Sequence, residues 1–165
     1  MMAAAAPRLR ALPLAVWERD ALKAALVKAG LPADDIAAPD RLFWRFERED
    51  DMPAGFGGLE IHAPDALMRS VVILPPLRRR GIGRSIVAAL EQEAQWRGCE
   101  AIYLLTTSEA NFFARLGYAP CQRHDVPDAI RASEQFASLC PATATVMVKR
   151  VSLPCQEVKD SVGLR

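Results

Sequence analysis

The chain has 165 residues, of which 51% are hydrophobic and 25% are charged, a size that suits one domain with a sizeable core. Its formal net charge is +1, and charges of both signs are mixed along it, which argues against a nucleic-acid or membrane-surface binder. No apolar run approaches the roughly 20 residues of a membrane span. The four cysteines are widely spaced and form no CxxC pair, so we expect no metal site. Because no membrane span is expected either, the predicted protein is soluble and cytoplasmic.

The pattern predicts one domain over 8–151, after a flexible alanine-rich end at 1–7 and before a disordered polar tail at 152–165. A hairpin turn is expected at 50–55, and a short turn or helix at 33–40. Strands are expected at 8–12, 42–48, 56–62, 67–74, 100–106, 118–123 and 143–151, and helices at 17–29, 83–97, 111–116 and 126–139. The helix between 67–74 and 100–106 makes those two strands parallel. The predicted class is therefore α+β, a mixed central sheet with helices on both faces.

The segment 77–84 reads LRRRGIGR and joins an expected strand to an expected helix. A helix N-terminus attracts phosphate through its unpaired N–H groups and its dipole, and glycine lets the backbone approach an anion closely. We predict a pyrophosphate cradle formed by Arg78, Arg79, Arg80, Gly81, Ile82, Gly83 and Arg84. The pattern lacks the GK[ST] of a P-loop and the third glycine of a dinucleotide fingerprint. The plainer alternatives are a basic helix start on a solvated surface and a nucleic-acid patch.

The spacing Arg78-x-x-Gly81-x-Gly83 resembles the [Q/R]xxGxG acetyl-CoA signature of the GNAT N-acetyltransferases. The stretch 112–118, FFARLGY, is similar to the later F-Y-x-K-x-G-F motif of that family. The stretch 104–107, LLTT, is similar to N-acetylglutamate synthase domains, and 127–141 looks like the GNAT proteins associated with arsenic-resistance operons. The resemblance covers about 8–151.

This resemblance implies a single GNAT fold and an N-acetyltransferase with acetyl-CoA as co-substrate. The acceptor would be the amine of a small amino-acid-like molecule, attacking directly in a ternary complex, and a link to arsenic resistance is among the implications. The alternative is a non-catalytic acetyl-CoA-binding module with a regulatory or sensing role. A protein-interaction domain that uses the basic loop is a weaker hypothesis. The expected partner is a small-molecule amine, with no nucleic acid and no membrane. A homodimer is also considered, because such dimers are common in the family and the last strand offers an edge.

The family resemblance also assigns residues to the cofactor. Val71, Val72 and Ile73 would lie along the pantetheine arm, with backbone contacts from Val71 and Ile73 and one N–H as the oxyanion donor. Their side chains are expected in the core. Asn111 and Phe113 would lie along the same arm.

An acid for the leaving thiolate is missing from the usual place, because Phe113 stands where the family often has tyrosine. Water, another hydroxyl or unassisted departure remain open, since a free thiol has a pKa near ~8.5. Tyr103 and Tyr118 flank apolar runs and are expected to be structural.

Glu60 is the candidate catalytic base, because it lies near the end of an expected strand, where the family resemblance implies that a substrate pocket opens. An edge carboxylate in water is the alternative, and His62 ranks below Glu60. Arg69 lies inside an apolar strand and needs a partner. It could clamp a substrate carboxylate or arsonate, or pair with Glu60.

Further substrate contacts are predicted from Ser70, Thr106 and Thr107, because ligands bind at the carboxyl ends of parallel strands. Cys140 lies in the arsenic-operon-like stretch. It is interpreted as a buried apolar thiol, since one cysteine is a poor arsenic trap.

Overall fold

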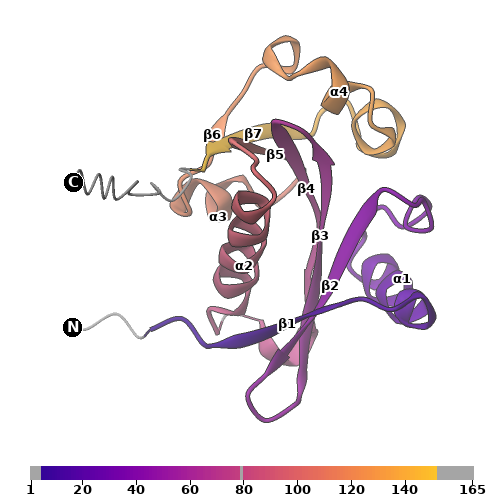
Figure 1. The fold of residues 1–165 in the computed structure, drawn as a ribbon, viewed down its shortest axis with the longest axis vertical. Helices are drawn as coiled ribbons and strands as arrows, with labels where there is room; N and C mark the ends of the chain where they lie inside the picture. Colours follow the sequence, from indigo (N-terminus) through magenta and orange to yellow (C-terminus); the bar gives the residue numbers. More distant parts are fainter. Residues whose placement is uncertain (1–4, 79, 152–165) are drawn as a thin grey trace, which may run out of the picture.

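The computed structural model describes residues 5–78 and 80–151 (Figure 1). Within them, seven strands form one mixed sheet in the order β1-β2-β3-β4-β5-β7-β6. The strands are β1 (Leu9–Pro13), β2 (Arg41–Arg48), β3 (Pro53–His62), β4 (Asp65–Ile73), β5 (Ala101–Thr106), β6 (Ala119–Pro120) and β7 (Thr145–Arg150). Only the β4–β5 pair of this described sheet is parallel, which confirms the predicted α+β class. The expected tail at 152–165 and most of the expected N-terminal end lie outside the described residues.

Helices cover both faces of the sheet, as predicted (Figure 1). The α-helices are α1 (Arg19–Lys28), α2 (Ile82–Trp96), α3 (Ala110–Arg115) and α4 (Asp128–Arg131). Short 3-10 or π turns are η1 (Val16–Glu18), η2 (Pro75–Leu77), η3 (Arg123–Asp125) and η4 (Gln135–Leu139). None of the helices in the described part of the chain has the length and apolarity needed to cross a bilayer.

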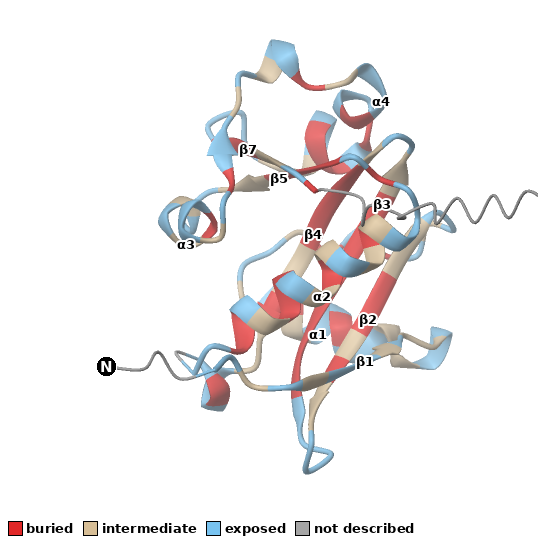
Figure 2. Ribbon diagram, turned by 60° about the vertical axis from the view of Figure 1, so that its left-hand side comes forward, coloured by how far each residue is buried: buried red, intermediate tan, exposed pale blue. Residues whose placement is uncertain are grey.

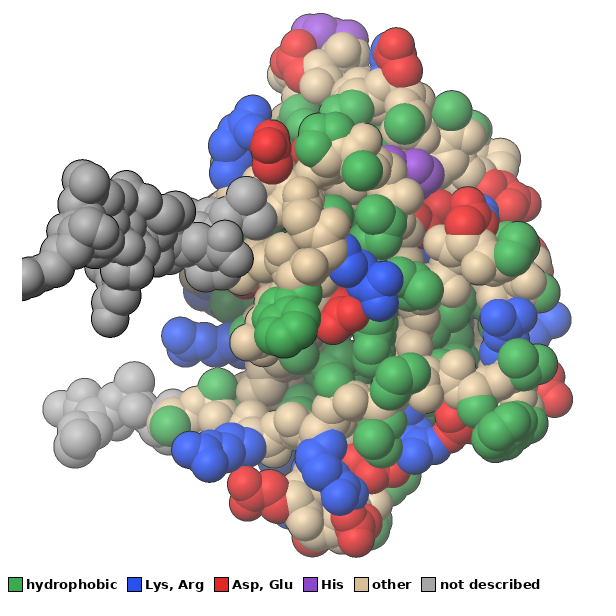
Figure 3. All heavy atoms as spheres, in the orientation of Figure 1, with side chains coloured by type: hydrophobic (Ala, Val, Ile, Leu, Met, Phe, Trp, Pro, Cys, Tyr) green, Lys and Arg blue, Asp and Glu red, His purple; other side chains and the backbone are tan. Residues whose placement is uncertain are grey.

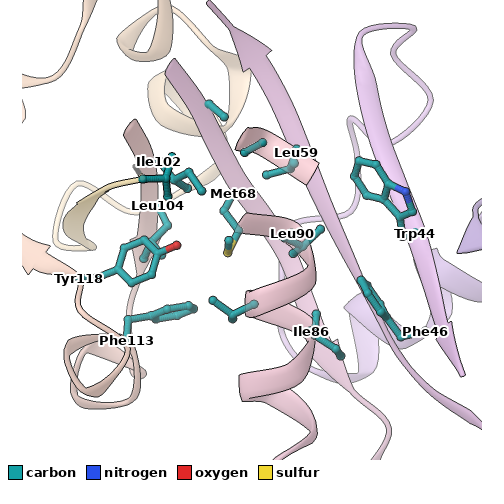
Figure 4. Packing of buried hydrophobic residues seen from close by; sticks show 14 of the residues in the cluster. Trp44, Phe46, Leu59, Met68, Ile86, Leu90, Ile102, Leu104, Phe113 and Tyr118 are labelled. Carbon is teal, nitrogen blue, oxygen red and sulfur yellow. The ribbon is translucent and has the colours of Figure 1, made fainter. Parts of the chain in front are cut away.

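Helix α2 packs on one face of the sheet through residues spaced four apart. Its side chains Ile82, Ile86, Leu90 and Ala94 are all buried, and each large one contributes roughly 1.5–3 kcal/mol by leaving water. Figure 4 shows Ile86 and Leu90 beside the sheet residues of the same cluster, among them Phe46. The periodicity that predicted this helix is therefore the periodicity that buries it.

Two further hydrophobic clusters lie on the opposite face. One joins α1 to the sheet through Leu22, Leu26, Phe43, Phe56 and Val72. The other lies under α4 and η4 and includes Leu67, Tyr103, Ile130, Phe136 and Val146. The central strands β3 and β4 are buried along most of their length, as Figure 2 shows. Along β4, Arg69 stands between Leu67 of one cluster and Val72 of the other, so a charged side chain separates two apolar clusters.

The parallel pair is short and then separates. It spans Asp65–Ala101 to Leu67–Tyr103, whereas both strands continue well beyond these pairs. On its other side β4 carries a bulge, because Ser70 and Val71 together face the single residue Gly57 of β3. Ser70 has φ +57°, a conformation that costs a non-glycine residue about 1 kcal/mol or more. The bulge therefore lies just beyond the point where β4 leaves β5.

Three sequence-based expectations need correction. The expected helix over 126–139 splits into α4 and η4, because Ser133 donates its hydroxyl to the Ile130 carbonyl and accepts from the Phe136 N–H. The expected strand over 118–123 shortens to the two residues of β6. The last strand, β7, is not a sheet edge, since its residues 147 and 148 pair with β6 on the side away from β5.

Candidate functional site

A cavity of about 520 Å³ opens where β4 and β5 separate. Its walls come from β4, from the end of β5 and the loop after it, from α3, from the loop after α1, and from η4. The lining residues are Met68, Arg69, Ser70, Val71, Leu104, Leu105, Thr106, Thr107, Ser108, Glu109, Phe113, Gly30, Leu31, Pro32, Gln135, Leu139, Cys140, Pro141 and Ala144. The cavity thus lies at the carboxyl ends of the two parallel strands, which is where we predicted substrate contacts from the sequence.

Backbone groups on the β5 side of β4 have no ladder partner beyond Leu67 among the described residues. Alternate N–H and C=O groups of a strand point toward each neighbour, so those on this side are free for a ligand. Val71 lines the cavity at this place. Val72 is buried on the opposite face, and Ile73 packs against the α2 cluster. The predicted cofactor contacts of these three residues stay predictions.

The glycine-arginine loop adjoins the far end of β4. Gly81 precedes α2 with φ +75°, and no described side chain caps the first turn of this helix, which leaves N–H groups there available. A Cβ on Gly83 would lie 2.8 Å from Ile73 Cδ1 and 3.1 Å from Phe112 Cζ. A larger residue at position 83 would therefore require the Ile73 and Phe112 side chains to shift. Strand β4 thus runs from Val71 on the cavity wall to Ile73, whose side chain lies beside Gly83 in the first turn of α2.

Three described arginines flank that helix N-terminus in the sequence. Arg78, Arg80 and Arg84 are exposed, while Ile82 is buried and packs into the core. Arg79 lies outside the described residues. These guanidinium groups add positive charge to the dipole end of a 15-residue helix. On the face shown in Figure 3, basic and acidic side chains are interspersed.

Helix α3 contributes an aromatic wall to the cavity. The Phe113 ring lines the cavity and meets Phe112 and Tyr118 edge to face, with centroids 5.0 and 5.7 Å apart. Asn111 is exposed on α3 and is not among the lining residues. The Tyr118 hydroxyl donates to Glu91 Oε1 at 3.0 Å. Burial, and then the charge of Glu91, raise the pKa of Tyr118, so this hydroxyl stays protonated and engaged in the core.

Arg69 is the centre of a buried ion-pair network on the α1 face. Its guanidinium donates to both oxygens of Asp35, to Glu60 Oε2 at 3.0 Å and to Ser70 Oγ at 3.2 Å. Four of its five N–H groups are therefore used, and its side chain is fully buried. The sequence offered a substrate anion or Glu60 as the partner of Arg69. The structure pairs Arg69 with Glu60 and also with Asp35. A substrate anion would have to displace one of them.

Asp35 ties this network to the loop after α1. Its carboxylate also accepts from Arg41 Nε at 3.1 Å. Burial alone would raise the pKa of Asp35, but the hydrogen bonds and charges of Arg69 and Arg41 lower it below its ordinary value. The carboxylates of Asp35 and Glu60 raise the pKa of Arg69, although its burial alone would lower that pKa. The loop that supplies Asp35 also supplies Leu31 and Pro32 to the cavity wall, so the network holds that wall against β4.

Glu60 contacts Arg69 but is not among the residues that line the cavity. Its side chain is 2% exposed, and its Oε1 lies 3.9 Å from Arg41 Nη2 and 3.6 Å from His62 Nε2. A general base must reach the substrate proton directly or through one water. The base role of Glu60 therefore stays a prediction that requires a relay to the cavity.

The remaining predicted contacts lie on the cavity wall. Thr106 Oγ1 accepts from the Glu109 N–H at 2.9 Å and so orders the loop after β5, and Thr107 and Ser70 also line the cavity. Cys140 lines it as well, although the sequence pointed to a buried core thiol. Burial raises the pKa of Cys140, so the thiol stays protonated near neutral pH.

Sequence reasoning did not single out Asp35 or Gln135. Asp35 lies in a loop between two elements, where an aspartate is ordinarily solvated, and its partner Arg69 is 34 residues away. Gln135 falls within the segment expected as a continuous helix, whose buried face could not be assigned before the break at Ser133 was known. No local pattern marks either residue.

Comparisons with known proteins agree with this geometry. Residues 9–118 match the model of the acetyltransferase (GNAT) family. Mouse N-alpha-acetyltransferase 80 is 42% identical over 52 residues, which are 32% of this chain and 17% of that protein. The chain spans less than two thirds of the curated relatives that it matches.

Two solved structures have the same fold. N-acetylglutamate synthase from Neisseria gonorrhoeae, complexed with coenzyme A and L-arginine, superposes with a TM-score of 0.69 at 16% identity, covering 88% of this chain and 34% of that chain. Rv2747 from Mycobacterium tuberculosis, in complex with CoA, has a TM-score of 0.69 at 22% identity over 88% of this chain and 100% of its own. The family model matches two thirds of the chain, and the separated parallel strands and the glycine-arginine helix start agree with it. The chain therefore belongs to the GNAT acetyltransferase family.

Proposed function

We propose that the chain transfers an acetyl group from acetyl-CoA to the amine of a small, amino-acid-like acceptor. The observation that supports this proposal is the course of β4, which runs from the cavity wall at Val71 to Ile73 beside Gly83 in the uncapped first turn of α2. A thioester placed at Val71 can extend its pantetheine arm past Ile73, and its pyrophosphate then reaches Gly81 to Arg84. The loop supplies backbone N–H groups and exposed guanidinium groups to that anion.

The reaction would proceed by direct attack within a ternary complex. The neutral amine nitrogen forms a bond to the thioester carbonyl carbon and becomes positively charged. The C–S bond then breaks to release the CoA thiolate, and the nitrogen gives its extra proton to water, which leaves the neutral amide. A free N–H on the β5 side of β4 would stabilise the oxyanion that forms during attack. The ammonium form of the acceptor must first lose a proton, for which Glu60 acting through water is the candidate. Phe113 has no proton for the thiolate, whose pKa near ~8.5 permits unassisted departure.

The acceptor class rests on resemblance to N-acetylglutamate synthase domains and to GNAT proteins of arsenic-resistance operons. A test is the release of free thiol from acetyl-CoA with a panel of amines. The panel holds L-amino acids, their phosphinic and arsenic-containing analogues, and simple alkylamines. Turnover confined to one group would identify the acceptor class, and Glu60→Gln should then lower kcat more than it raises KM.

Cofactor binding is tested separately by calorimetry with acetyl-CoA. The double variant Arg78→Glu with Gly81→Glu should bind about 100-fold more weakly, because the Arg78 guanidinium is lost, two carboxylates repel the pyrophosphate, and a side chain is strained at the positive φ of position 81. The matched control is Arg97→Glu with Gly98→Glu at the other end of α2, where Gly98 also has a positive φ, +79°. Equal affinities of the two double variants would contradict the proposed cradle.

A second candidate function is favoured by the burial of Glu60 and by the absence of an acidic hydroxyl at Phe113. Glu60 is buried in ion pairs away from the cavity wall, and Phe113 cannot act as an acid. These facts suit a non-catalytic acetyl-CoA-binding module with a sensing or regulatory role. Tight acetyl-CoA binding without thiol release from any amine of the panel would favour this alternative.

A further inference from the structure

Two charged side chains stand among the described residues that line the cavity, Arg69 and Glu109. They differ in accessibility, since the side chain of Arg69 is fully buried whereas Glu109 is exposed. A solvent-exposed charge can contact an entering molecule directly, while a buried charge is shielded by the groups that already surround it. The accessible charge on the described cavity wall is therefore the carboxylate of Glu109.

Arg69 has little capacity left to bind a carboxylate of the acceptor. Its guanidinium already donates to both oxygens of Asp35, to Glu60 and to Ser70. A substrate anion would have to displace one of the two carboxylates and leave it buried without its partner, which is strongly unfavourable. Among the described lining residues, no cation is thus vacant for an anionic acceptor.

Glu109 is held at the cavity by the loop after β5. Its N–H donates to Thr106 Oγ1 at 2.9 Å, and its carbonyl accepts from the Phe113 N–H at 3.1 Å. Phe113 lines the same cavity one helical turn later, and residues four apart share one face of a helix. Both bonds use the backbone of Glu109, and no described residue pairs with its carboxylate. The backbone therefore fixes the residue on the cavity side and leaves its charge available.

We propose that the cavity selects acceptors that carry an ammonium group and no carboxylate, with Glu109 binding the ammonium group before attack. This inference rests on the proposed acetyl transfer and narrows its acceptor to amines, amides and esters of amino-acid size. A free amino acid brings the same ammonium group, but Glu109 repels its carboxylate, which finds no vacant cation on the described wall. The exposed arginines of the glycine-arginine loop are not among the described lining residues. The ammonium then loses its proton before the neutral nitrogen attacks, so the transfer itself is unchanged.

The test compares L-alanine with isopropylamine, in which a methyl group replaces the carboxylate, at saturating acetyl-CoA. Isopropylamine is the more basic amine, so its smaller neutral fraction opposes the expected result. We expect its kcat/KM to exceed that of L-alanine at least about tenfold, because a carboxylate without a partner is costly to place in the cavity. A higher kcat/KM for L-alanine would contradict the proposal.

The role of Glu109 is tested by Glu109→Gln, which removes the charge and keeps the length of the side chain. In about 20 mM NaCl, KM for isopropylamine should rise about three- to fivefold, and the difference should shrink below about twofold in 0.5 M NaCl, because salt screens an exposed charge. Glu109→Asp keeps the charge and should stay within about twofold of the wild type. The control is Glu100→Gln, an exposed glutamate that precedes the other end of β5, which should change neither value.

A second measurement needs no turnover. Isopropylamine is titrated into the protein with CoA bound and followed by ligand-observed NMR, and its Kd should rise about three- to fivefold in Glu109→Gln. An unchanged Kd, or an increase that does not depend on NaCl, would overturn the role of Glu109. Absence of thiol release by the wild type with every amine would count against the proposed function, while the NMR titration would still decide whether Glu109 binds the ammonium group.

Discussion

Replacing Asp35 by asparagine removes one charge from the buried network around Arg69 while keeping the shape of the side chain. In the wild type both Asp35 oxygens accept from Arg69, and one also accepts from Arg41. Asparagine offers one oxygen and turns an N–H toward the guanidinium, so at most one of the two Arg69 bonds survives. Glu60 then remains the sole carboxylate on Arg69 among the described residues.

The size of the effect follows from the burial of both partners. The side chains of Asp35 and Arg69 are both fully buried, and breaking such a pair on one side costs about 3–5 kcal/mol. Because Glu60 still compensates part of the charge, we expect the lower end, about 3 kcal/mol. For a domain of this size that corresponds to a fall in Tm of about 6–12 °C. The control is Glu93→Gln, which breaks a half-exposed pair with Arg97 and should cost less than about 0.5 kcal/mol.

The assay is urea unfolding followed by circular dichroism, at pH 7 and in steps down to pH 3. The lowered pKa of Asp35 stabilises the fold above the unfolded pKa of about 3.9, and this stability is lost as pH falls through the folded value. Asp35→Asn should therefore differ most from the wild type at pH 7 and converge toward it in acid. A loss below about 1 kcal/mol at pH 7, or a gap that stays constant with pH, would refute the reasoning.

The remaining predictions concern the α2 side of the sheet. Tyr118→Phe removes a hydrogen bond to Glu91 and should cost about 1 kcal/mol in urea unfolding. Because that hydroxyl is engaged away from the cavity, thiol release from acetyl-CoA should keep its wild-type rate, and a large fall in kcat would contradict this. Gly83→Val introduces a side chain against Ile73 and Phe112 at the start of α2. Calorimetry should show acetyl-CoA binding weakened at least about tenfold, while full affinity would mean that the cofactor does not approach this turn.

The elements around the proposed cofactor site could be predicted because their signals are local. The four-residue spacing from Ile82 to Ala94 defines both the helix and its buried face. The glycines at 81 and 83 between a strand and that helix indicate an anion site, since backbone conformation and N–H exposure depend on a few neighbouring residues. A helix between two strands makes them parallel, which predicted the mixed sheet.

The ion-pair network and the η4 wall of the cavity were decided by tertiary structure. Arg69 needed a partner by the chemistry of a buried charge, yet only the path of the loop after α1 brings Asp35 to it. The break at Ser133 precedes η4, which lines the cavity, and the pairing of β6 removes β7 from the sheet edge. Periodicity and turn chemistry act over a few residues, and the sequence alone determined what depends on them. Contacts between distant residues depend on strand register and on where loops return, because many side chains could satisfy a buried charge and only packing selects one.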